Sequence, residues 1–342
     1  MDLSTSYLGL ALPSPLVASA SPVTRSVNGI RELAAAGVGA VVLPSLFEEQ
    51  LRREERRDEA LTETHADAFG EALSYFPAAT SGLPGRPQRY LNLLERAAEA
   101  VDIPVIASLN GSTAGGWEDF ARSLQDAGAA AIEINVYFVP GDPHTSGRDV
   151  EDVHVEILHR VKGVVSVPVA VKLSPHFSSP GEMALRLDQA GADGLVLFNR
   201  FLQPEIDVES LEVQPAIALS VPGEARLPRT WIAILRGHVV GSLAATTGVD
   251  RWEDVVKYLL AGADVVMTAS ALMRHGPAYA RTLLSGLEQW MARKGFDSLD
   301  EVRGLLAVPA GVDPTAYERA GYVSALERAR STYGDLRVGT RR

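Results

Sequence analysis

The sequence contains no cysteine. Disulfide bonds, thiolate metal sites, cysteine-ligated iron–sulfur clusters and cysteine nucleophiles are therefore excluded. The sequence also lacks a run of the roughly 18 apolar residues that a membrane-spanning helix needs. Residues 1–15 show no basic start followed by an apolar stretch, which is the pattern of a secretory signal. We therefore expect a cytoplasmic protein that does not enter a membrane.

Positive charge is scarce as well. The chain has 32 lysines and arginines against 43 aspartates and glutamates, a net charge of −11 and an isoelectric point of about 5.2. Such a surface repels nucleic-acid phosphates and anionic lipids, so neither nucleic acid nor a membrane is an expected partner. No single element has His, Asp and Glu at ligand spacing, so no metal is expected either.

Short apolar segments alternate with segments of helical periodicity along most of the 342 residues. This alternation predicts parallel strands joined by helices, and eight such units favour a closed (β/α)8 TIM barrel over an open sheet. A dinucleotide-binding open sheet would also need a Gly-x-Gly-x-x-Gly after an early strand, which is absent. The expected strands are residues 16–20, 40–43, 104–109, 130–135, 168–173, 194–198, 238–244 and 264–268.

An Ala-Gly pair recurs just before several of these strands, at residues 36–37, 127–128, 190–191 and 261–262. A glycine at this point supplies the left-handed conformation that ends a helix, so the repetition supports the predicted helix-to-strand turns.

Two longer insertions, residues 48–89 and residues 199–228, interrupt the alternation of expected strands and helices. Both follow the ends of expected strands, so both are predicted to overhang the C-terminal mouth of the barrel, where active sites of this fold lie. The expected domain organisation is a barrel over residues 1–294 and a helical C-terminal extension, residues 295–342, packed on its flank.

Lys172 is one of four lysines and lies near the end of an apolar strand segment. A buried ammonium group is costly unless it meets a negative charge or takes part in chemistry. It could contact an anion or a flavin, act as a Schiff-base amine, or simply reach solvent. Asn135 and Asn199 end the fourth and sixth expected strands, and their amides suit the edge of a heteroaromatic ring.

Small residues follow the last two strands, at Thr247-Gly248 and Ala269-Ser270. In barrels, turns at this position often expose backbone amides to a phosphate group.

Together these residues resemble the dihydroorotate dehydrogenase family, and the similarity in the order of the motifs and in their residues extends over residues 5–300. The resemblance implies a TIM barrel that binds flavin mononucleotide (FMN) and oxidises the small molecule dihydroorotate to orotate in pyrimidine biosynthesis. It implies Asn135 and Asn199 as substrate-binding residues and Lys172 as a catalytic residue. The FMN-binding positions that it implies are Ser19, Ala20, Ser45, Ser108, Asn110, Asn135, Lys172, Thr247, Gly248, Ala269 and Ser270.

The sequence departs from the family where the substrate is handled. The family's loop Asn-x-Ser-Cys/Ser-Pro-Asn reads Asn-Val-Tyr-Phe-Val-Pro here, so Phe138 replaces the proton-accepting Cys or Ser. Pro44 and Ala79 align with a lysine and an asparagine that serve the family's substrate site. A substitute base could come from Tyr137, Asp142 or His144, each of which could equally have a structural or solvated role.

Three functions therefore remain open. The first is an FMN-dependent oxidoreductase acting on a CH–CH bond, in which Tyr137 or His144 replaces the missing base. The second is a flavin-binding protein that does not turn over dihydroorotate, or that acts on a different substrate. The third is an aldolase-type lyase that uses Lys172 as a Schiff-base amine, because the barrel alone does not determine the reaction. A homodimer and a redox partner protein are the expected protein partners.

Overall fold

Eight parallel strands form a closed barrel in the computed structural model, which describes residues 1–47, 86–111, 117–137, 141–200, 204–214, 218–309 and 311–333. Each strand pairs with its neighbours in one continuous sheet, and pairing of β4 with β6 completes the circle. The predicted TIM barrel is therefore confirmed. The barrel strands are β3 (Leu16–Ala18), β4 (Ala40–Val42), β6 (Val105–Gly111), β7 (Ala131–Val136), β8 (Val169–Leu173), β9 (Gly194–Leu197), β12 (Ser242–Ala245) and β13 (Val265–Thr268).

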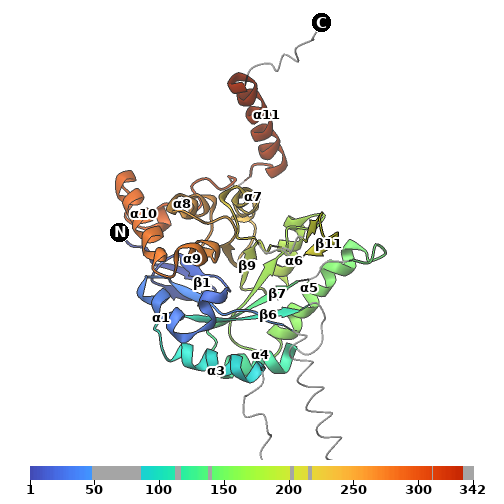
Figure 1. Ribbon diagram of the computed structural model, residues 1–342. Helices are drawn as coiled ribbons and strands as arrows, with labels where there is room; N and C mark the ends of the chain where they lie inside the picture. Colours follow the sequence, from blue (N-terminus) through green and yellow to red (C-terminus); the bar gives the residue numbers. More distant parts are fainter. Residues whose placement is uncertain are drawn as a thin grey trace, which may run out of the picture.

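A ring of helices surrounds the strands and covers their outer side (Figure 1). A short additional helix, α9 (Ser270–His275), lies between β13 and α10. The helices of the ring are α1 (Val27–Ala35), α3 (Arg86–Ala98), α4 (Trp117–Asp126), α5 (Gly147–Lys162), α6 (Pro180–Gln189), α7 (Arg226–Leu235), α8 (Trp252–Ala261) and α10 (Tyr279–Lys294).

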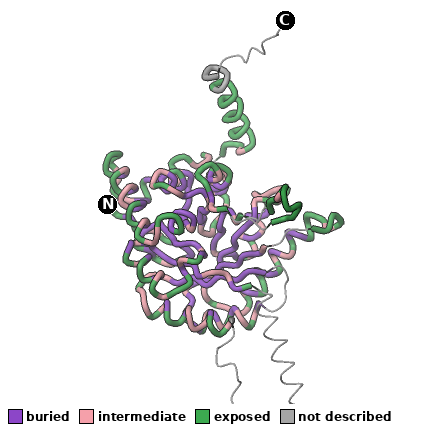
Figure 2. Tube along the Cα trace, in the orientation of Figure 1, coloured by how far each residue is buried: buried purple, intermediate pink, exposed green. Residues whose placement is uncertain are grey.

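The strands are buried on both faces, and Figure 2 shows them as the buried centre of the molecule. One set of side chains packs against the helices, and the other fills the barrel interior. The interior set includes Tyr7, Leu8 and Leu12 from a hairpin of β1 (Thr5–Tyr7) and β2 (Leu10–Leu12). Leu8 N donates to Ser242 Oγ at 3.0 Å at the start of β12, so the hairpin covers the N-terminal end of the barrel.

The predicted Ala-Gly turns end four of the helices. Gly37, Gly128, Gly191 and Gly262 have φ values of +96°, +91°, +93° and +116°, a region that residues with a Cβ rarely adopt. The seventh barrel strand begins at Ser242 rather than at His238, because the backbone amides of residues 240 and 241 instead donate to the carboxylate of Asp188 in the last turn of α6.

The second insertion contains an exposed hairpin of β10 (Glu205–Asp207) and β11 (Glu212–Gln214), followed by the short helix η2 (Pro222–Ala225). Most of the first insertion, residues 48–85, lies outside the described residues. β5 (Leu46–Phe47), which precedes it, pairs with the end of β6.

The C-terminal extension divides into two parts. Its first part includes η3 (Leu299–Glu301) and packs on the barrel, where Val308 N donates to Ala233 O at 2.9 Å. Its second part, α11 (Pro314–Tyr333), projects away from the barrel (Figure 1), and its described side chains are almost all exposed. The reason lies in the sequence of α11, whose apolar residues are spread around the helix instead of forming one face that could pack.

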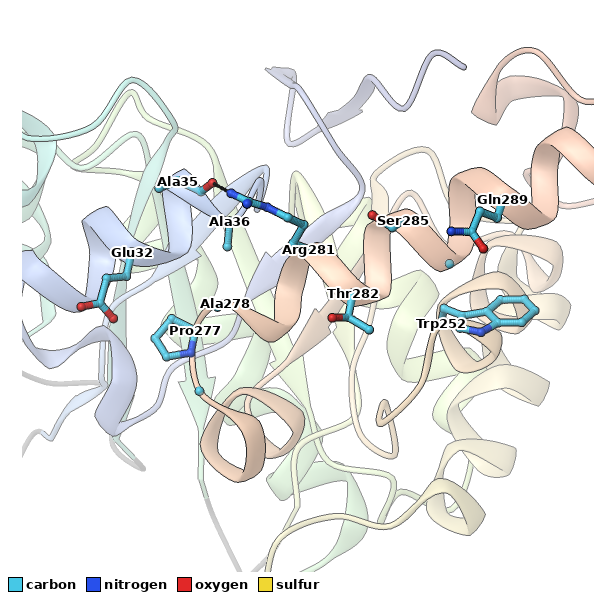
Figure 3. Close-up of a pocket in the computed structure, with 12 residues that line it drawn as sticks. Glu32, Ala35, Ala36, Trp252, Pro277, Ala278, Arg281, Thr282, Ser285 and Gln289 are labelled. Atoms are coloured by element: carbon cyan, nitrogen blue, oxygen red, sulfur yellow. Dashed lines mark hydrogen bonds between the residues drawn. The ribbon is translucent and has the colours of Figure 1, made fainter.

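A groove of about 830 Å³ lies on the outside of the barrel between α1 and α10 (Figure 3). Arg281 of α10 reaches across it and donates to Ala35 O at 2.7 Å. At one end of the groove Gly286 packs against the Trp252 ring so closely that a Cβ at this position would lie 2.3 Å from Trp252 Cγ. The absence of a side chain at Gly286 therefore sets the distance between α10 and α8.

Replacing Gly286 with alanine should lower the stability of the protein by roughly 1–3 kcal/mol, because the added methyl group overpacks the α8–α10 contact. The measurement is the denaturant midpoint of unfolding. Gly147→Ala at the exposed start of α5 is the matched control, since nothing lies within 4 Å of its added Cβ. Equal midpoints for the two variants would show that the contact does not constrain the helices.

Candidate active site

Polar side chains occupy neighbouring positions at the C-terminal end of three adjacent strands. Asn110 of β6 lies opposite Asn135 of β7, which in turn lies opposite Lys172 of β8. All three are buried. Asn199, which follows β9, donates from its Nδ2 to Asn135 Oδ1 at 2.8 Å. The amides and the amine that the sequence indicates therefore lie together on one side of the barrel mouth.

Lys172 is almost fully buried, since its residue is only 8% exposed. Its Nζ lies 3.5 Å from Oε1 of Glu133, which is 1% exposed and belongs to the adjacent strand β7. Glu133 was not among the predicted site residues, although an acidic residue in the apolar segment Ala-Ile-Glu-Ile-Asn was a visible signal. Alternation along β7 places Glu133 on the same face as Asn135, one step deeper into the barrel.

A cavity of about 220 Å³ opens beside Lys172. Its lining comes mainly from the loops after β3, β9, β12 and β13, which meet at the C-terminal mouth. Arg200, Ser220 and Met273 are among the lining residues that were not predicted from the sequence. The predicted site residues that line the cavity are Ser19, Ala20, Lys172, Asn199, Thr247, Ala269 and Ser270.

The turn after β12 has an unusual backbone. Thr247 and Gly248 have φ values of +81° and +72°, and a Cβ at Gly248 would lie 2.6 Å from Ala225 N. Tyr258 of α8 fixes the turn from below, since its hydroxyl donates to the carbonyl oxygens of Thr246 and Thr247 at 3.0 and 2.7 Å. Burial raises the pKa of Tyr258, so this hydroxyl stays protonated and can donate.

Hydroxyl and amide groups converge at this turn. Gly248 N donates to Ser220 Oγ at 3.1 Å, and Ser220 donates from its N and Oγ to Ser270 Oγ at 2.9 and 3.0 Å. Arg274 donates to Ser220 O at 2.7 Å and also pairs with Asp250. The Gly248 amide is used within this cluster, so the hydroxyls of Ser220 and Ser270 are the groups here that can donate hydrogen bonds to a phosphate.

Arg200, which also belongs to the insertion of residues 199–228, holds the same segment at the mouth. Arg200 donates from Nε to Glu224 Oε1 at 3.0 Å and from Nη1 to Ala218 O. These bonds join the end of β9 to the segment that delivers Ser220. Sequence reasoning could not find Arg200 or Ser220, because their position depends on the path of a long insertion.

Ser45 and Ser108 form a separate contact near β5 and β6. Their hydroxyl oxygens lie 2.8 Å apart, and Ser108 N donates to the Tyr90 hydroxyl at 2.9 Å. Burial, and to a lesser degree the negative charge of Glu133, raise the pKa of Tyr90. Neither serine lines the 220 Å³ cavity.

The residues considered as a base occupy different environments. Tyr137 is partly buried and directly follows β7. His144 is exposed, and its backbone amide donates to the carboxylate of Asp142, also exposed, at 2.9 Å. Phe138 lies outside the described residues.

Among the described residues, no group of three or more His, Cys, Asp or Glu side chains could hold a metal ion. None of the helices in the same ranges is long and apolar enough to cross a membrane.

The barrel carries a polar cluster and a cavity at its C-terminal mouth, which is where the active sites of TIM-barrel enzymes lie. A family model described as dihydroorotate dehydrogenase matches residues 3–291. The chain therefore belongs to the dihydroorotate dehydrogenase family. This places it among the flavin-dependent oxidoreductases that act on CH–CH groups.

Individual relatives support this assignment. An Aeropyrum pernix protein, provisionally named dihydroorotate dehydrogenase A (fumarate), is 30% identical over 222 residues, which are 62% of this chain and 70% of the relative. The NAD-dependent dihydropyrimidine dehydrogenase subunit PreA of Escherichia coli is 27% identical over 89% of this chain and 76% of its own length. The catalytic subunit of dihydroorotate dehydrogenase B (NAD(+)) of Pyrococcus abyssi is 27% identical over 89% of this chain and 98% of the relative.

Replacing Ser220 with alanine should destabilise the protein by roughly 1–3 kcal/mol, because the buried Gly248 amide loses its acceptor. Chemical unfolding of the flavin-free protein measures this. Ser123→Ala is the control, since the exposed Ser123 hydroxyl bonds only to Asp119 O of its own helix. An unchanged midpoint for Ser220→Ala would contradict the described cluster.

Proposed function

We propose that the protein is an FMN-dependent oxidoreductase whose substrate is a small molecule other than dihydroorotate. The observation that supports this most directly is the cluster at the barrel mouth of the buried Asn135 and Lys172 with the partly buried Asn199. An amine and two amides present both donors and acceptors, which is the complement that the polar edge of a flavin ring requires.

The residues present fit FMN at both ends. Lys172 and Asn135 would hold the ring, and the hydroxyls of Ser220 and Ser270 would hold the phosphate, with Lys172 and both serines lining the cavity. The cavity of about 220 Å³ is smaller than the roughly 300–1,000 Å³ of typical ligand pockets. FMN would therefore extend from it onto the rim formed by Asn110 and Asn135.

FMN would supply the two-electron redox chemistry that side chains lack. The chain's own contribution is positional and electrostatic. Lys172 would place a positive charge beside the ring in a buried setting, where charge acts more strongly than in water. The Asn135–Asn199 bond would fix the orientation of the amide that meets the ring or the substrate.

The proposal of a different substrate is supported by the sequence at the family's base position. Phe138 cannot accept a proton, and Pro44 replaces the aligned lysine. Among the substitute bases, Tyr137 follows β7 directly and by alternation lies on the side of Asn135, whereas His144 and Asp142 lie on an exposed turn. We therefore propose Tyr137 as the first candidate for the substitute base and His144 as the second.

The Schiff-base alternative is less well supported. A Schiff-base lysine must present its amine to a carbonyl substrate, but Lys172 Nζ lies 3.5 Å from the buried Glu133 carboxylate in an ion pair. Two relatives are named as subunits, one of a dihydropyrimidine dehydrogenase and one of dihydroorotate dehydrogenase B (NAD(+)). By analogy we propose a redox partner protein for this chain, and a homodimer as its own assembly.

Purified protein, or flavin-free protein mixed with FMN, should show absorbance bands near roughly 370 and 450 nm that differ from those of free FMN. Anaerobic addition of dihydroorotate should leave these bands unbleached, whereas a substrate of the enzyme should bleach them. Absence of any bound flavin would overturn the proposed cofactor. Rapid bleaching by dihydroorotate would instead overturn the proposed change of substrate.

Lys172→Met should weaken FMN binding by on the order of tenfold or more, because a charge-assisted contact is worth about 1.5–3 kcal/mol. Fluorescence titration of flavin-free protein with FMN measures the dissociation constant. Lys257→Met is the matched control, because Lys257 also sits 3.5 Å from a carboxylate but lies on α8, outside the cavity. Equal affinities for the wild type and Lys172→Met would remove Lys172 from the site.

A further inference from the structure

Glu133 is the most unusual charged residue in the described part of the chain. Its side chain points into the barrel interior between Ser108 of β6 and Ala170 of β8, and the residue is 1% exposed. Neither carboxylate oxygen has a hydrogen-bond partner among the described residues. Burial of a carboxylate without hydrogen bonds is strongly unfavourable unless a positive charge lies close by.

The groups around Glu133 supply one such charge. Lys172 Nζ, at 3.5 Å from Oε1, is the cation that pairs with it within the described ranges. The other titratable groups that sense its charge are Tyr7 of β1 and Tyr90 of α3. Burial is the largest cause of the raised pKa of each tyrosine, and the negative charge of Glu133 raises both further; Asp264 adds to the effect on Tyr7. Both phenols are therefore neutral and do not compensate the carboxylate.

The distance between Glu133 and Lys172 is informative. At 3.5 Å the two charges attract each other without forming a short hydrogen bond, so Nζ keeps donor capacity for another group. Lys172 also lines the mouth cavity, whereas Glu133 does not. Lys172 is thus placed between a buried carboxylate on its inner side and the cavity on its outer side.

We propose that Glu133 is a positioning residue that acts through Lys172 on a bound flavin. The carboxylate anchors the amine on the inner side of the mouth and so limits how closely its positive charge approaches the flavin ring. Without this anchor the amine can move toward the ring and favour the electron-rich reduced flavin, so Glu133 lowers the midpoint potential of the flavin. This inference rests on the proposed FMN-dependent function.

The first test is the midpoint potential of bound FMN in the wild type and in Glu133→Gln, which keeps the shape of the side chain and removes the charge. We expect Glu133→Gln to bind reduced FMN about tenfold more tightly relative to oxidised FMN, which equals a rise of about 30 mV for a two-electron couple. Glu133→Asp, which keeps the charge, should remain near the wild type. An unchanged potential in Glu133→Gln would overturn the proposal, because a purely structural residue would also leave it unchanged.

The second test asks whether the effect passes through the amine. In a Lys172→Gln background, Glu133→Gln should change the potential much less than it does in the wild type. An equal change in both backgrounds would show that Glu133 acts on the flavin directly and would overturn the role through Lys172. The comparison needs the wild type, both single variants and the double variant, and only the double variant leaves no unpaired buried charge.

The third test needs no flavin and so separates this inference from the proposed function. In flavin-free protein at fixed pH, acetylation of Lys172 by acetic anhydride should be several-fold faster in Glu133→Gln, because the amine loses the carboxylate that anchors it on the inner side of the mouth. Mass spectrometry measures the rate, with Lys257 in the same molecule as the internal reference. An unchanged Lys172 rate would overturn the ion pair itself, whether or not the protein binds FMN.

Discussion

Parallel closure of the barrel is the constraint on which the site depends. Because all eight strands run in the same direction, their carboxyl ends meet at one rim, and residues far apart in sequence become neighbours there. The register of β6, β7 and β8 sets Asn110, Asn135 and Lys172 side by side. A shift of one residue in any of these strands would turn its polar side chain toward the helices and dissolve the cluster.

The interior of the barrel gives the rim its electrostatic character. Apolar side chains fill the N-terminal half, where the β1–β2 hairpin adds Tyr7 and Leu12 to the strand residues. Glu133 and Lys172 lie above this layer, shielded from water, so their mutual attraction and their effect on a ligand are stronger than at the surface. The phosphate side of the mouth differs, because the neutral hydroxyls of Ser220 and Ser270 lie there and the nearby guanidinium groups of Arg200 and Arg274 are paired with Glu224 and Asp250.

Much of this could be predicted from the sequence, and particular residues show why. Lys172, Asn135 and Asn199 were identifiable because a polar residue at the end of an apolar strand segment has a defined place in a barrel. Glu133 follows from the same logic, as it alternates with Asn135 along β7, yet strand patterns alone do not say which buried acid meets which base. Ser220 and Arg200 were not predictable, since a long insertion brings them to the mouth. The position of α11 was not predictable either, because this helix lacks an apolar face that would indicate where it packs.

We propose above all that the C-terminal mouth of the barrel binds a flavin by its phosphate as well as by its ring. Calorimetric titration of flavin-free protein with FMN and, separately, with riboflavin tests this most directly, because the two ligands differ only in the phosphate. We predict that FMN binds at least about tenfold more tightly, the difference expected for a set of charge-assisted hydrogen bonds worth about 1.4 kcal/mol or more. Equal affinities, or binding of neither ligand, would contradict the account.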